Sequence, residues 1–119
     1  MKFVQYEFEF TYPSLNYTNR KHHIERNNLK KLFMNSIAVK IQEQGLIRFE
    51  CRVRILIDLC FKRKKRRDVD NYTPKWLLDA LVKCEVIKDD NKDIIEEPPN
   101  VMIIDNEPEE KMIVRIEAA

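Results

Sequence analysis

The segment 47–61 constrains the fold of this chain more than any other. Its odd-numbered positions are Ile, Phe, Cys, Val, Ile, Ile, Leu and Phe, whereas its even-numbered positions are mostly Arg, Glu or Asp. Alternation with a period of two predicts a β-strand with one buried face. The segment is longer than a usual strand, so we expect a bend or a bulge within it. The rest of the chain must supply partner strands and a cover for the apolar face.

The N-terminal third predicts a second strand and a helix. Residues 2–10 alternate between apolar and polar side chains, which predicts a half-buried strand. Residues 11–21 are rich in turn-forming residues and predict a loop. Apolar side chains then recur at helical spacing over 27–44 and predict a helix. Gly45, the only glycine, follows directly and is expected to end that helix.

A second helix is expected to open at Thr73-Pro74. Threonine is a good N-cap, and proline suits the first helical turn, where its missing N–H group costs no hydrogen bond. The apolar positions after this start are spaced i, i+3, i+4 and i+7, which predicts one buried stripe. That stripe consists of Leu77, Ala80, Leu81 and Cys84.

The last part of the chain predicts a loop and two short strands. Residues 85–99 are acidic and end in two prolines, which indicates a loop. Residues 101–105 and 112–116 read as strands, most simply joined as a hairpin. The predicted order is β-α-β-α-β-β. We therefore expect an α+β fold in which a mixed sheet is packed with two main helices, in one domain covering residues 1–119.

Composition indicates a cytosolic protein that meets a polyanion. Charged residues make up 35% of the chain, above the usual share of about 25%. Residues 1–75 carry a net charge of +9 and residues 76–119 a net charge of −7, so the first part could bind a polyanion. The three cysteines are widely spaced and form no Cys-x-x-Cys pair, which favours reduced, mostly buried thiols. No apolar run is long enough to span a membrane, so no membrane partner is expected.

The strongest functional signal is the decapeptide 62–71. Six cations run directly into Asp68 and Asp70. In an extended segment these two side chains would point to the same side. Paired carboxylates suit Mg²⁺, and the cations suit phosphate, which together point to a phosphodiester-cleaving enzyme. The predicted phosphate contacts of the run are Lys62, Arg63, Lys64, Lys65, Arg66 and Arg67.

A third carboxylate is needed, and spacing leaves its identity open. The candidates are Asp89, Asp90 and Asp93, which lie in the loop after the second helix. A helix of about 11 residues spans about 16 Å, so this loop starts at the far end of the helix. Either the helix axis lies across the site, or the loop folds back toward the start of the helix.

Simpler interpretations compete with each of these signals. A D-x-D sequence in a polar loop is more often a turn feature than a metal site. Lys75 and Asp79 have the spacing of an ordinary surface ion pair on a helix, although a cation there could also stabilise a transition-state phosphate. We expect Trp76 to pack against the sheet rather than to stack on a base. His22 and His23 are expected to be surface residues.

Taken together, these residues resemble the RusA family of Holliday junction resolvases, which are small and often phage- or prophage-encoded. The resemblance spans nearly the whole chain, and its specificity comes from the combination of motifs at these spacings rather than from any one of them. The matching motifs are Arg67-Asp68-Val69-Asp70-Asn71, Leu78-Asp79-Ala80-Leu81, Val86-Ile87-Lys88-Asp89-Asp90, and the early Pro13-Ser14-Leu15-Asn16 followed by Arg20.

The resemblance implies a catalytic site and a substrate. Asp68, Asp70 and Asp90 would be the catalytic carboxylates that bind Mg²⁺, with Mn²⁺ as a substitute, and Lys75 would be the catalytic lysine. The family's lysine position holds Pro74, and a one-residue insertion before it accounts for the shift to Lys75. Asn16, Arg20 and Asn71 would add contacts to DNA.

The resemblance also implies how such an enzyme works. A homodimer would make two symmetric nicks in four-way or branched DNA during recombination and repair, leaving 5′-phosphate ends, in the cytoplasm of a bacterium or a phage-infected cell. Two symmetric cuts agree with a two-fold dimer that presents two identical sites. The alternative is a branched-DNA-binding module on a nuclease scaffold that no longer cleaves.

Overall fold

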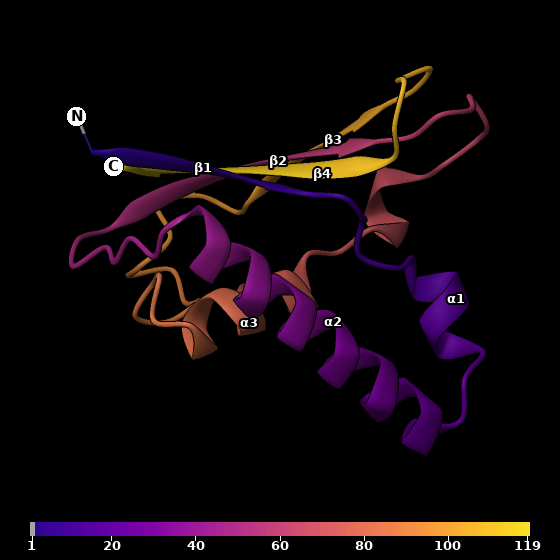
Figure 1. Ribbon diagram of the computed structural model, residues 1–119, viewed down its shortest axis with the longest axis horizontal. Coiled ribbons are helices and arrows are strands. Elements are labelled where there is room, and N and C mark those ends of the chain that lie inside the picture. Colours follow the sequence, from indigo (N-terminus) through magenta and orange to yellow (C-terminus); the bar gives the residue numbers. More distant parts are fainter. Residues whose placement is uncertain (1) are drawn as a thin grey trace.

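The computed structural model describes residues 2–119 and has the predicted α+β architecture, a mixed four-stranded sheet with helices (Figure 1). The strands are β1 (Phe3–Phe8), β2 (Val53–Cys60), β3 (Asn100–Ile104) and β4 (Lys111–Ala118). The helices are α1 (Leu15–Asn19), α2 (His23–Gln44) and α3 (Lys75–Lys83), with a single 3₁₀ turn, η1 (Val69–Asn71), before α3.

Strand order explains why the helices cover only one face of the sheet. The order is β1-β4-β2-β3, in which β2 and β3 are parallel and β4 is antiparallel to both β1 and β2. The connections from β1 to β2 and from β2 to β3 both advance in the same direction across the sheet. Right-handed crossovers that advance in one direction place their helices on the same face. Figure 1 shows α2 and α3 together on one side of the sheet and, among residues 2–119, no helix on the other.

The predicted hairpin between the last two strands is wrong. β3 pairs with one edge of β2, and β4 pairs with the other edge and with β1. The segment 105–110 crosses the end of β2, where the backbone N–H of Glu107 donates to the carbonyl of Phe61. In this position β4 has a hydrogen-bonded neighbour on both sides, which a terminal hairpin would not provide.

The core lies between the sheet and helices α2 and α3. The alternation read from the sequence gives the buried face correctly in β1 and β2. Burial also alternates in β4, and the inward side chains of all three strands are almost fully buried. Ile57 in β2, for example, is flanked by Val101 of β3 and Val114 of β4, and its exposed fraction is 0%. Helix α2 contributes Phe33, Ile37 and Ile41, and α3 contributes its predicted stripe, of which only Cys84 stays partly exposed.

Helix α2 ends where glycine was expected and begins earlier than predicted. Gly45 has φ of 105° and donates its backbone N–H to Ile41, so the residue that tolerates positive φ stops the helix. The buried Tyr6 hydroxyl donates to the carbonyl of Gly45, which ties this end to β1. At the other end the His22 ring accepts a hydrogen bond from the backbone of Ile24, so the helix starts at residue 23 rather than near 27.

Three other local predictions need correction. The loop expected over 11–21 contains the short helix α1. The strand expected over 47–61 is regular only in β2, because the preceding residues leave the sheet and the backbone of Phe49 donates to Val86 in the loop after α3. Helix α3 has Pro74, not Thr73, at its N-cap, and no side chain caps it.

The burial of the three cysteines and the membrane-spanning character of the helices can be read from the structure. Cys60 is buried, Cys84 is partly buried and Cys51 is exposed, so the expected burial of the thiols holds for only part of the set. No helix within residues 2–119 has the length and apolar character needed to cross a membrane.

We predict that Ile57→Ala lowers the free energy of unfolding by about 2–5 kcal/mol, because it leaves a cavity in the centre of the sheet's covered face. Met102→Ala on β3 is the matched control, since that side chain is 54% exposed and should change stability by less than about 0.5 kcal/mol. Urea denaturation measures both. Equal losses for the two variants would contradict the assignment of the covered face.

Candidate functional site

The centre of the candidate site is the ammonium group of Lys75, the first residue of α3. Its Nζ lies 2.9 Å from Oδ2 of Asp90 and 3.0 Å from Oδ1 of Asp79. Lys30 of α2 approaches the other oxygen of Asp79 at 2.7 Å. Two lysines and two aspartates from α2, α3 and the following loop therefore form one continuous ionic chain.

The contacts in this chain favour the charged forms of Lys75, Asp79 and Asp90. The hydrogen bond to Asp90, and then the one to Asp79, raise the pKa of Lys75. The hydrogen bond from Lys75 lowers the pKa of Asp90. Burial by itself would raise the pKa of Asp79, but the hydrogen bonds from Lys30 and Lys75 outweigh burial and the pKa falls below its usual value. At neutral pH the charged Lys75 ammonium is therefore in direct contact with two ionised carboxylates, those of Asp79 and Asp90.

The loop after α3 folds back toward the start of that helix. Asp90 follows Lys75 by 15 residues, and their contact requires the chain to return along α3. Of the three acidic candidates in this loop, Asp90 is the one in contact with Lys75. Asp89 accepts hydrogen bonds from the backbone of Asp90 and the side chain of Asn91, and Asp93 is exposed.

Asp68 and Asp70 do not lie on an extended strand. Asp68 itself has extended backbone angles, but the next three residues form η1, so the simple alternation assumed for this pair does not apply. Both side chains are exposed, and an oxygen of Asp68 lies 3.7 Å from Arg66. Over residues 2–119, no three His, Cys, Asp or Glu side chains lie close enough together to enclose a metal ion. A shared site of Asp68, Asp70 and Asp90 therefore stays a prediction.

Two residues predicted to contact DNA are also hydrogen-bonded to each other. The Asn71 side-chain oxygen accepts a hydrogen bond of 2.9 Å from the backbone of Asn16, at the start of α1. Close by, the buried Tyr12 hydroxyl donates to the carbonyl of Tyr72 at 2.7 Å. These bonds fasten the early loop to the segment between η1 and α3. Arg20, at the C-terminal end of α1, is exposed.

The basic run forms a loop beyond the end of β2, and its last member has a structural role. Arg67 is only 9% exposed, stacks 3.8 Å from the centre of the Phe61 ring, and donates to Asp105 at 3.1 Å. It also donates to the carbonyl of Arg63, so it closes the loop on itself. The remaining members of the run are exposed: Lys62, Arg63, Lys64, Lys65 and Arg66.

The two oppositely charged parts of the sequence are not far apart in space. The segment 105–110, with four acidic residues, crosses the end of β2 from which the basic run leaves. Lys62 lines a shallow hollow together with Glu9, Glu109 and Glu110. The net positive charge available to a polyanion is therefore concentrated toward the tip of the loop.

Sequence reasoning missed the role of Lys30. Nothing near Lys30 in the sequence marks it as a partner of Asp79, which lies 49 residues later. The contact arises because α2 and α3 pack side by side on the same face of the sheet. Trp76 contacts Phe33 of α2, with ring centres 6.1 Å apart, and is only partly buried.

Comparison with known proteins adds no family assignment. No family model matches the chain, and no curated protein matches it. The resemblance to RusA resolvases rests on the sequence motifs alone.

We predict that Asp79→Asn lowers the free energy of unfolding by about 1–2 kcal/mol at pH 7, because it removes the anion between Lys30 and Lys75. The lowered pKa of Asp79 means that this stability is present above the ordinary carboxyl pKa of about 3.9 and disappears as the pH falls through the folded-state value. The difference between wild type and variant, measured by denaturation from pH 7 to pH 3, should therefore shrink with acid. A difference in the free energy of unfolding that does not change with pH would contradict the ionic origin of the stabilisation by Asp79.

We predict that Arg67→Ala destabilises the protein by about 1–3 kcal/mol, since it removes a stacked cation and its hydrogen bonds. Lys64→Ala removes a charge from the same loop and is the control. Lys64 is exposed and makes no ion pair within residues 2–119, so its loss should leave stability within about 0.5 kcal/mol. Thermal or urea unfolding that ranks the two variants in the opposite order would contradict the anchoring role.

Proposed function

We propose that this protein is a Mg²⁺-dependent, structure-specific DNA endonuclease of the RusA type, which resolves four-way junctions by paired nicks. The contact between Lys75 and Asp90 supports this proposal most directly. The resemblance assigns both residues to catalysis, they lie 15 positions apart in the sequence, and their side chains meet at 2.9 Å. The exposed cations of the basic loop supply the affinity for phosphate that a DNA enzyme needs.

The chemistry of the acidic residues suits the proposed metal. Asp68, Asp70 and Asp90 offer carboxylate oxygens, the ligand type that Mg²⁺ and Mn²⁺ both accept. Mg²⁺ is commonly held by only one or two carboxylates, with water and substrate phosphate completing its shell, so a compact cluster of three is not required before DNA binds. When bound, Mg²⁺ would polarise the scissile phosphate and lower the pKa of a bound water.

The other residues have separate tasks in this proposal. Lys62, Lys64 and Lys65 hold phosphates of the junction arms, and Arg67 keeps their loop in place. Lys75 brings a permanent positive charge to the cleavage site, where it stabilises the negative charge that develops on the phosphate. Asp79 is a positioning residue, since it holds the Lys75 ammonium from one side.

The proposal includes a homodimer acting in the cytoplasm of a bacterium or a phage-infected cell. A junction is resolved by two symmetric cuts, and a two-fold dimer presents two identical sites to it. The products would be nicked duplexes with 5′-phosphate ends.

The second candidate is a branched-DNA-binding module without cleavage activity. Its support is that Asp79 and Asp90 already neutralise Lys75, an arrangement that could serve stability alone. In that case the basic loop would bind DNA, and the ionic chain would only hold α3 and its loop together.

Cleavage of a synthetic four-way junction tests the proposal. We expect paired nicks with Mg²⁺, none with EDTA, and a loss of at least about 100-fold in rate for Asp70→Asn, because a metal-binding carboxylate becomes a neutral amide. Asp93→Asn is the matched control, since it makes the same change at an exposed aspartate outside the proposed ligands and should cut normally.

Two results would count against the enzyme. If Asp70→Asn cuts as fast as wild type, the assignment of the metal ligands fails. If wild type binds the junction in a salt-dependent manner but never cleaves it with Mg²⁺ or Mn²⁺, the binding module replaces the nuclease.

A further inference from the structure

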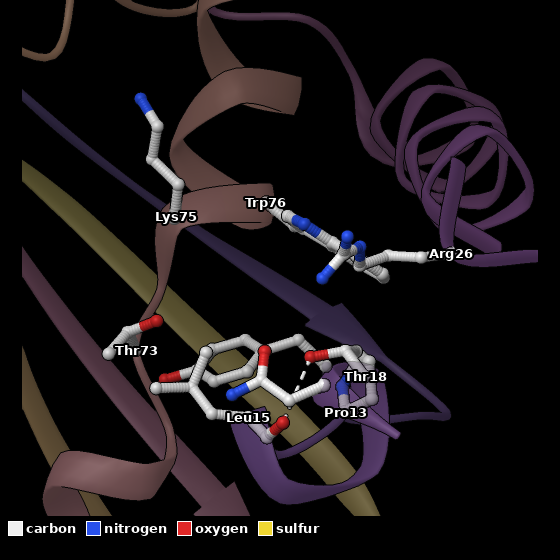
Figure 2. A pocket seen from close by; sticks show the side chains of 9 residues that line it. Pro13, Leu15, Thr18, Arg26, Thr73, Lys75 and Trp76 are labelled. Carbon is white, nitrogen blue, oxygen red and sulfur yellow. Dashed lines mark hydrogen bonds between the residues drawn. The ribbon is translucent and has the colours of Figure 1, made fainter. Parts of the chain in front are cut away.

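A pocket lies beside the first turn of α3, and Lys75 of the ionic chain is one of the residues that line it. It has a volume of about 310 Å³ and lies between α1, the first turn of α2 and the start of α3 (Figure 2). Lys75 and Trp76 both line the pocket, and in Figure 2 the Lys75 side chain extends away from Arg26 whereas Trp76 lies toward it. The pocket therefore adjoins the proposed cleavage site at Lys75. The volume is at the lower end of the range of about 300–1,000 Å³ for ligand pockets, so the pocket admits a small group and no duplex.

The walls of this pocket combine an aromatic plane with a cation. Trp76 is partly buried, and Phe33 supports its ring from the core side. Arg26 projects from α2 toward the Trp76 indole (Figure 2). Arg26 is partly buried and makes no ion pair among residues 2–119, unlike the paired lysines of the ionic chain. A flat apolar surface beside an unpaired cation matches a ligand that is itself aromatic and anionic.

The remaining walls are rigid. Tyr12 and Thr18 are almost fully buried, and both use their hydroxyl groups in internal hydrogen bonds, Tyr12 to the carbonyl of Tyr72 and Thr18 to carbonyls of the first turn of α1. The hydrogen bond between Asn16 and Asn71 holds α1 against the segment before α3. The pocket is therefore formed before any ligand arrives, and its polar rim is supplied by Asn19 and Thr73.

We propose that this pocket binds one unpaired nucleotide of a DNA strand, with the base against Trp76 and its phosphate near Arg26. This inference rests on the proposed function. It explains how the protein would distinguish a branch point from an uninterrupted duplex. Bases in a duplex are stacked and paired on both sides, whereas a branch point offers bases that can leave the stack. Stacking on an aromatic side chain is tolerant of base identity, because every base has an aromatic face.

The chain provides its own reporter, since Trp76 is its only tryptophan. Tryptophan fluorescence of the full-length protein is titrated, without divalent metal, with a short single-stranded oligothymidine, the same oligomer with one abasic nucleotide, a blunt duplex and thymidine monophosphate. We expect the single strand to quench the fluorescence at saturation and the duplex to leave it nearly unchanged. Replacing one base by an abasic nucleotide should weaken binding several-fold.

Variants separate the pocket from general attraction to phosphate. By anisotropy with a labelled oligomer, Trp76→Leu should lower the affinity about 5- to 150-fold. Arg26→Gln should lower it about 10-fold, as expected for a charged hydrogen-bonded contact. Lys31→Gln is the matched control, since it removes one cation from the exposed surface of the same helix and should change the affinity by no more than about 2-fold. Trp76→Phe keeps an aromatic plane and should retain most of the affinity. This variant shows whether the loss of affinity in Trp76→Leu comes from lost stacking rather than from a folding defect.

Each outcome bears on the proposal separately from cleavage. Equal quenching by duplex and single strand, or Arg26→Gln binding like Lys31→Gln, would overturn it. Quenching by thymidine monophosphate at the same affinity as by the oligomer would overturn a strand site in favour of a free-nucleotide site. If the pocket binds single strands as expected while junctions remain uncut with Mg²⁺, the nucleotide site stands and the nuclease proposal fails.

Discussion

The position of β4 between β1 and β2 is the constraint on which the rest of the structure depends. The parallel strands β1 and β2 each pair with β4 and not with each other. Without β4, no backbone hydrogen bonds would therefore connect β1 to β2. With it, both crossovers advance the same way across the sheet, and both long helices are placed on one face. Their adjacency brings Lys30 of α2 to Asp79 of α3, and so assembles the ionic chain around Lys75.

Periodicity was sufficient to predict most elements but not their pairing. The alternation in 53–60 and the helical spacing before Gly45 are local properties, and both are found as predicted. The hairpin prediction failed because a short connection between two strands favours neighbouring positions, whereas here six residues cross the end of β2 instead. The interior position gives β4 backbone hydrogen bonds to both β1 and β2, which favours it over a hairpin with β3. A local sequence pattern does not indicate such pairing.

The same limit applies to the candidate site. The resemblance assigned Lys75 and Asp90 to the same catalytic site without predicting that they touch, and spacing alone left open the path of the loop that brings them together. Asn16 and Asn71 were predicted as two independent contacts to DNA, and the structure joins them to each other. Lys30 and Arg26 were not identified, because each acquires its surroundings only when α2 packs against α3.

Arg67 changes how the basic run should be regarded. A run of six cations in sequence suggests a freely moving tail, yet this one is closed at its base by a cation stacked on Phe61 and bonded to Asp105. Only about five residues lie between Phe61 and Arg67, whose side chains stack on each other. The conformational entropy of the loop is therefore already low before a partner binds. A polyanion that docks on Lys64 and Lys65 therefore orders less chain than it would on a free tail, and more of the electrostatic attraction remains as affinity.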